Sequence, residues 1–157
     1  MTFSEQFKIL ALTVSANVGA GGVDSKSVNF GKLHKGCFLL NFGAITADDV
    51  LSVYVGAATA TKTTAVAYKY RHAAADTTVA LSDTYGALTD VPSTGLTLSA
   101  TTFDNKLLIV EINSQAIADA TPWVTLEIAG SASVQNISII FIGEPRFASN
   151  GGLPTVI

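Results

Sequence analysis

The sequence has few of the residues that form cross-links or carry chemistry. Its one cysteine, Cys37, excludes a disulfide within the chain. The apolar run around Cys37 predicts a buried, unreactive thiol. The two histidines, His34 and His72, are not spaced as a metal pair, and zinc sites need three or four ligands at characteristic spacings. Without a Gly-x-Ser-x-Gly nucleophile motif either, we expect no enzyme, no metal and no cofactor.

Charged residues are scarce as well. They make up 13% of the chain, against about 25% of an average soluble domain. The net charge is −3 and the Lys and Arg residues are scattered, so we expect no nucleic-acid partner. A surface of Thr, Ser and Gly has two interpretations: an ordinary β-domain with threonine-covered faces, or a subunit whose outer faces are covered by neighbours. We favour the second, because free monomers usually display mixed charge.

Long hydrophobic runs are absent. The longest apolar runs are far shorter than the ~20 residues of a membrane-spanning helix. The opening residues are interrupted by Glu5 and Lys8, unlike the apolar segment of a signal peptide. We therefore expect a soluble protein with no membrane partner.

The sequence does contain short apolar runs rich in β-branched residues. Three of them, at 105–113, 123–128 and 137–142, are separated by polar, turn-forming pieces and are too short to be typical helices. The run at 36–42 is apolar on both faces, which is typical of a central strand. Residues 5–14 favour a first strand, with a short amphipathic helix capped by Ser4 as the alternative.

These runs predict the fold class. The length of 157 residues fits one domain, 1–157, with a sizeable core. We predict an all-β fold, a single antiparallel β-sandwich that is jelly-roll-like and has about eight strands.

Two segments are candidates for interaction. Residues 76–105 are rich in Thr, Ser, Asp and Gly, with turns marked by Pro92 and Gly95 and one short strand at 96–99. The end of the chain, 144–157, contains two prolines that prevent a regular element. Its apolar tip indicates either docking on a neighbour or ordinary fraying.

Three phrases carry a family resemblance. They are Phe-Ser-Glu-Gln-Phe-Lys-Ile at 3–9, Leu-Leu-Ile-Val-Glu-Ile-Asn at 107–113, and Phe-Ile-Gly-Glu-Pro-Arg-Phe at 141–147. They resemble small head proteins of tailed bacteriophages and prophages, and are similar to capsid decoration (cement) subunits. The likeness extends loosely over most of the chain and is strongest from Tyr68 to Phe147.

The resemblance implies a structural virion protein that is made in the host cytoplasm and sits on the capsid surface. Its partners would be the major capsid protein and further copies of itself, with a trimer favoured. Such a subunit stabilises the shell through mass action, because it binds only the assembled shell. We predict that segments 1–8 and 144–157 make the contacts, through Phe3, Phe7, Glu144, Arg146, Phe147, Leu153 and Ile157.

An alternative function is a carbohydrate- or receptor-binding β-sandwich of a phage tail or fibre. That function would need an exposed aromatic platform. The candidates for it are Tyr54, Tyr68, Tyr70 and Tyr85.

Overall fold

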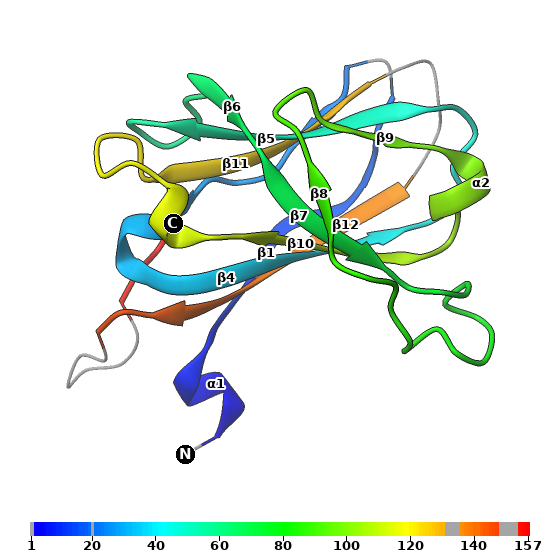
Figure 1. Cartoon of the computed structure of the whole chain (residues 1–157), viewed down its shortest axis with the longest axis horizontal. Helices are drawn as coiled ribbons and strands as arrows, with labels where there is room; N and C mark the ends of the chain where they lie inside the picture. The colour runs from blue at the N-terminus through cyan, green and yellow to red at the C-terminus, as the bar shows by residue number, and fades with distance from the viewer. Residues whose placement is uncertain (1, 20, 131–135, 148–153) are drawn as a thin grey trace.

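The chain folds into two antiparallel sheets of six strands each that pack face to face (Figure 1). This architecture comes from a computed structural model, which describes residues 2–19, 21–130, 136–147 and 154–157. Strands account for 48% of the chain and helices for 10%. The predicted all-β sandwich is therefore confirmed, but it has about 12 strands rather than about eight.

The first sheet, sheet A, has the strand order β1-β12-β4-β10-β7-β8. Its strands are β1 (Lys8–Asn17), β12 (Asn136–Pro145), β4 (Leu33–Phe42), β10 (Leu107–Ile112), β7 (Tyr68–His72) and β8 (Thr89–Val91). The second sheet, sheet B, is built around the paired strands β11 and β5. The short strands β2 and β3 pair with the free side of β11, and the short strands β6 and β9 pair with the free side of β5. These strands are β2 (Val23–Asp24), β3 (Val28–Asn29), β11 (Trp123–Ala129), β5 (Asp49–Gly56), β6 (Thr64–Val66) and β9 (Leu96–Leu98).

The strand order is that of a jelly roll. The first strand, β1, pairs with the last, β12, and β12 pairs with β4, which pairs with β10. In the other sheet β2 and β3 together occupy one strand position beside β11, and β6 and β9 together occupy one beside β5. With each split pair counted once, and with β7 and β8 left out, each sheet has four strand positions. The two sheets together then have the eight positions of a double Greek key. The higher count comes from these split strands and from β7 and β8, which extend sheet A.

Alternation of side chains builds the core between the sheets. In β10, Leu108, Val110 and Ile112 are buried, whereas the residues between them are half-buried. Phe38 of β4 and Phe141 of β12 meet in the core with ring centroids 4.9 Å apart.

Two glycines make room for Phe141. Gly36 and Gly143 lie opposite each other in the β4–β12 pair. A Cβ added to either glycine would lie 2.4 Å from the Phe141 ring. Only glycine lets the ring lie flat against this pair of strands.

The first residues combine both predicted alternatives. A single helical turn, α1 (Phe3–Gln6), precedes β1, which begins at Lys8. Thr2, rather than the expected Ser4, is the N-cap, and its backbone N–H donates a 2.5 Å hydrogen bond to the Glu5 carboxylate. A carboxylate three residues after the cap is the signature of a capping box, which explains the choice of Thr2.

Much of the 76–105 segment belongs to the folded body. The predicted strand at 96–99 is confirmed as β9, which pairs with β5, and β8 adds to the edge of sheet A. A turn of helix, α2 (Ala100–Phe103), follows and buries Phe103. The longest part outside the named elements is thus 76–88. Two short 3₁₀ turns, η1 (Phe30–Lys32) and η2 (Ser114–Ala116), complete the described elements.

Candidate functional site

Part of the outer face of sheet B is covered by the chain itself. Thr125 of β11 points away from the core, yet it is only 1% exposed, because the segment after β5 lies over it. The Ser27 hydroxyl is 2.8 Å from that of Thr125 and accepts a 2.8 Å hydrogen bond from the Ala60 backbone. Lys62, from the same segment, forms an ion pair with Glu127 on this face. These contacts close the surface over Thr125, while Trp123 and Tyr54 on the same face stay partly exposed.

The outer face of sheet A, in contrast, carries apolar side chains that stay partly or fully exposed. Strand register places them in two adjacent rows across the sheet. Ile9 and Ile140 are 49% and 40% exposed, respectively. The rows consist of Ile9, Ile142 and Cys37, and of Ala11, Ile140, Leu39 and Ile109.

Part of this face is hollowed into a trough of about 710 Å³, which we call the outer trough. Cys37, Ile109 and Ile142 contribute to its lining from neighbouring strands. Phe7, just before edge strand β1, and Tyr85, in the segment between β7 and β8, line it from outside the strands. Figure 1 shows α1 and the loop after β7 extending from the same side of the sandwich.

Charges in the outer trough are paired with one another. Three ion pairs lie along it: Lys35–Glu144 at 3.2 Å, Arg71–Glu111 at 3.0 Å and Lys69–Asp90 at 2.5 Å. The trough is therefore neutral. Taking these three basic and three acidic residues from the nine and twelve in the chain leaves six and nine, so the net charge of −3 lies entirely elsewhere.

The position of Cys37 differs from the sequence prediction of a buried thiol. The thiol lies on the outer face and is half-buried, because Phe38 and Leu40 take the inward positions of β4. Burial of the thiol raises its pKa, and the nearby Glu111 carboxylate raises the pKa further. The protonated form of the thiol is favoured, and its low reactivity stays a prediction. Residues 36–42 are apolar on both faces because one face of β4 packs in the core and the other contributes to the outer trough.

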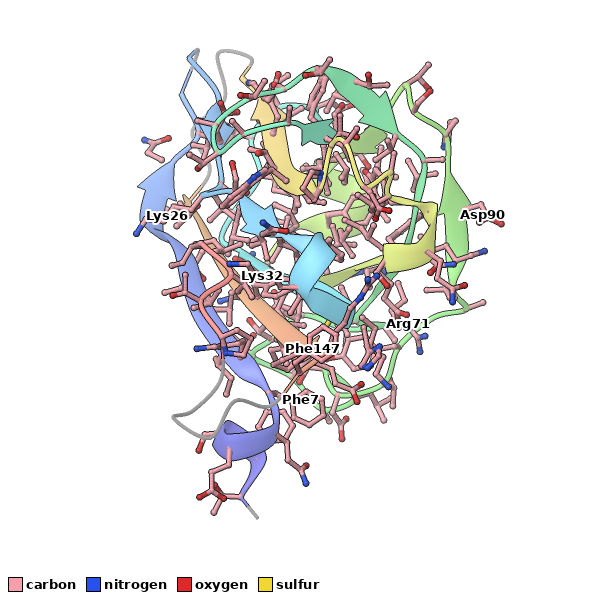
Figure 2. The ribbon with its side chains drawn as sticks, turned by 90° about the vertical axis from the view of Figure 1, so that its left-hand side faces the viewer. Phe7, Lys26, Lys32, Arg71, Asp90 and Phe147 are labelled. Atoms are coloured by element: carbon pink, nitrogen blue, oxygen red, sulfur yellow. The ribbon has the colours of Figure 1, made fainter. Side chains whose placement is uncertain are left out.

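The structure brings the predicted contact residues to one end of sheet A. Lys8 lies opposite Gly143, so the residues before β1 and after β12 are neighbours in space. Figure 2 shows Phe7 and Phe147 at this end, with α1 extending beyond the body. Phe147 is 76% exposed. Phe3 is 56% exposed, and its ring packs against that of Phe7 in a tilted arrangement with centroids 4.6 Å apart.

The remaining contact residues are tied to the body of the protein. Glu144 pairs with Lys35 in the trough, and the Arg146 guanidinium donates to the Leu33 carbonyl at 2.8 Å. Ile157 is 48% exposed, although Val156 beside it is buried. Leu153 lies outside the described residues.

Sequence reasoning missed the floor of the trough, including Ile9, Ile109 and Ile142. The available signal was that several strands are apolar at successive positions, which means that both faces of sheet A are apolar. Of the tyrosines proposed for an aromatic platform, Tyr54 is half-buried and Tyr85 is 37% exposed and lines the outer trough. Tyr68 is buried, and Tyr70 packs against Phe103 and His72.

The described part of the chain has neither a metal-binding cluster nor a membrane-spanning helix. There, no group of three or more His, Cys, Asp or Glu residues is placed to hold a metal ion. Within the same residues, no helix has the length and apolar character to cross a membrane. In comparisons with known proteins, no family model, curated protein or solved structure matches the chain.

Proposed function

We propose that the protein is a structural subunit of a tailed-phage virion, one that decorates the outside of the capsid and binds the major shell protein. The observation that carries this proposal is the collection of exposed apolar side chains at one end of sheet A, beside the outer trough. Phe147 lies at this end and is 76% exposed, whereas Ile157, which is 48% exposed, follows the β3–η1 region. The phrases in the sequence that resemble decoration subunits support the same function.

The exposed side chains at this end of sheet A are suited to binding another protein. Aromatic anchors surrounded by neutral surface are typical of protein interfaces, whose centres are depleted of charge. A buried aromatic side chain removes about 150–250 Å² from water. At about 25 cal/mol per Å², one such anchor contributes roughly 4–6 kcal/mol before the costs of ordering are subtracted.

A rigid scaffold supports these anchors. Arg146 is held on both its backbone and its side chain: its N–H donates to the Lys32 carbonyl at 2.9 Å and its Nε donates to the Leu33 carbonyl at 2.8 Å. Phe147 therefore follows a fixed residue, which lowers the entropy lost when a partner covers the ring. Many copies bound in this way would stabilise an assembled shell through mass action.

The test is occupancy on intact particles. Purified particles should contain the protein in copies comparable to the major shell protein, measured by quantitative mass spectrometry. Phe147→Ala should lower this occupancy at least about tenfold at limiting protein concentration, in line with loss of a central anchor. Leu81→Ala is the matched control, because Leu81 is 65% exposed but lies in the 76–88 segment. Absence from particles, or equal occupancy of both variants, would contradict the proposal.

A further inference from the structure

We propose that the outer trough binds a second copy of this chain, with α1 of that copy seated in the trough. This inference concerns contacts between copies and does not require the shell. It joins two apolar features of one chain that lack a cover among the described residues: the projecting Phe3–Phe7 pair, and the trough floor formed by Cys37, Ile109 and Ile142.

The projecting side of this contact is α1. It has four residues, none of them buried. A helix of one turn is not stable in water by itself, and in proteins most helical stability comes from tertiary packing. Phe3 nevertheless packs against Phe7 and stays 56% exposed, so its ring presents an apolar surface to solvent, while Phe7 is half-buried at the trough.

The receiving side is the trough. Its volume of about 710 Å³ lies within the range of natural binding pockets, about 300–1,000 Å³. The aliphatic residues Ile109 and Ile142 offer apolar contact to an aromatic ring, and the ion pairs along the trough satisfy one another without help from a partner. An uncharged, apolar insert is the occupant that this surface favours.

Charge favours a copy of the same chain as that occupant. The trough is neutral, so it exerts little net repulsion on a chain whose overall charge is −3. The segment that would enter is balanced too, with Glu5 and Lys8 as its charged residues. A strongly charged partner would find no net field to attract it.

The positions of the two features favour reciprocal exchange. Phe7 belongs to the projecting pair and also lines the trough, so donor and acceptor lie side by side on one face. A two-fold axis through such a self-complementary face places each α1 over the partner's trough. The ring of three copies that the resemblance implies would instead need donor and acceptor on different sides of the subunit.

The available area is sufficient for a stable contact. Six strands at about 4.8 Å spacing span ~24 Å, and their lengths of three to ten residues average about 24 Å. The face therefore offers roughly 500–800 Å², close to the ~800 Å² that each partner buries in a standard interface.

Cys37 allows a direct test, because it is the only cysteine and it lines the trough. Phe3→Cys in the full chain places a second thiol on α1. After oxidation with oxidised glutathione at pH 9, chosen because the raised pKa of Cys37 slows its exchange at neutral pH, we expect a covalent dimer on a non-reducing gel, with positions 3 and 37 linked in its peptide map. Phe147→Cys is the matched control: its position is 76% exposed but not on α1, and it should yield less than about a tenth as much 37-linked dimer.

Sedimentation velocity of proteins without added cross-links provides the second measurement. The wild type should dimerise, and Phe3→Ala should weaken the dimer at least about tenfold, since removal of a central aromatic anchor typically costs at least this much. Phe147→Ala, the variant that tests shell binding, should leave the dimer unchanged, so the two proposals can fail separately.

Three results would overturn the inference. A 3–37 link within a monomer would mean that α1 fills its own trough. A wild type that stays monomeric at all concentrations, with no 3–37 link in Phe3→Cys, would show that copies do not meet there. A covalent trimer would show that three copies form a closed ring, in which each α1 enters the next copy's trough, instead of a two-fold dimer.

Discussion

A single hydroxyl ties the two sheets together. Tyr68 of β7 is 5% exposed, and its hydroxyl donates a 2.8 Å hydrogen bond to the Leu51 carbonyl of β5, in the opposite sheet. Burial of the side chain raises the pKa of Tyr68 well above its ordinary value, because the charged phenolate is disfavoured away from water. The hydroxyl therefore keeps its proton in the folded state at a pH where an unfolded tyrosine loses it.

Tyr68→Phe should lower the free energy of unfolding by about 1–3 kcal/mol at pH 7, since it leaves a buried carbonyl without its donor. The wild-type contribution is complete below the unfolded pKa of about 10 and is lost as the pH rises above it, because the unfolded chain then releases a proton that the folded chain retains. The difference between the two proteins should consequently shrink between about pH 10 and pH 11. Urea unfolding at pH 7, 9 and 11 measures this.

Tyr85→Phe is the control for this prediction, because Tyr85 is 37% exposed. Its stability should match the wild type at each pH. A Tyr68→Phe difference that stays constant from pH 7 to pH 11 would contradict the assignment.

At the scale of elements, the end of the chain is attached to its own domain. The Val156 side chain is 1% exposed, and its carbonyl accepts a 2.7 Å hydrogen bond from the Asn29 N–H. The Lys32 ammonium donates to the Thr155 carbonyl at 3.0 Å. The described residues of the tail, 154–157, therefore follow the β3–η1 region, and the Ile157 side chain is what they present to a partner.

Val156→Ala should destabilise the protein by about 1–3 kcal/mol, because it removes buried methyl groups and leaves a cavity. The neighbouring Ile157→Ala should change stability by less than about 0.5 kcal/mol, as expected for a surface position. Thermal and urea unfolding of both variants provide the comparison. Equal effects at the two positions would show that the tail is not held as described.

At the scale of the whole molecule, charge is unevenly distributed. The outer trough is neutral through its internal ion pairs, and the surplus of acidic residues lies on the rest of the surface. Exposed ion pairs contribute little stability individually, about 0–1 kcal/mol. In the outer trough, the ion pairs place charged groups beside the apolar residues and so keep this face hydrated. Because each pair is neutral, the face has no net charge that would repel another copy.

The dissociation constant of the proposed dimer should therefore change less than about threefold between 50 and 500 mM NaCl. Salt screens net charge across an interface, and this interface brings no net charge together. Sedimentation equilibrium across this salt range measures it, with circular dichroism to verify that the fold is unchanged. A tenfold or larger weakening at high salt would show that charge attraction holds the copies together.

From the sequence, the alternation and β-branched content of short runs predicted the all-β class, the sandwich and most of its longer strands. The same local rules placed the turn at Gly95, where a φ of +93° favours glycine. The capping residue was misplaced from Thr2 to Ser4, although the run Thr2-Phe3-Ser4-Glu5 carries the capping-box pattern in the sequence itself.

Tertiary structure decided what local rules leave open. Alternation tells which residues share a face of a strand, but not which face meets another layer. Cys37 and Ile109 were therefore indistinguishable from core residues until the sheets were paired. The pairing of β1 with β12 also brought Phe7 and Glu144, far apart along the chain, to the same end of one sheet. That proximity depends on long-range strand register, which no short stretch of sequence specifies.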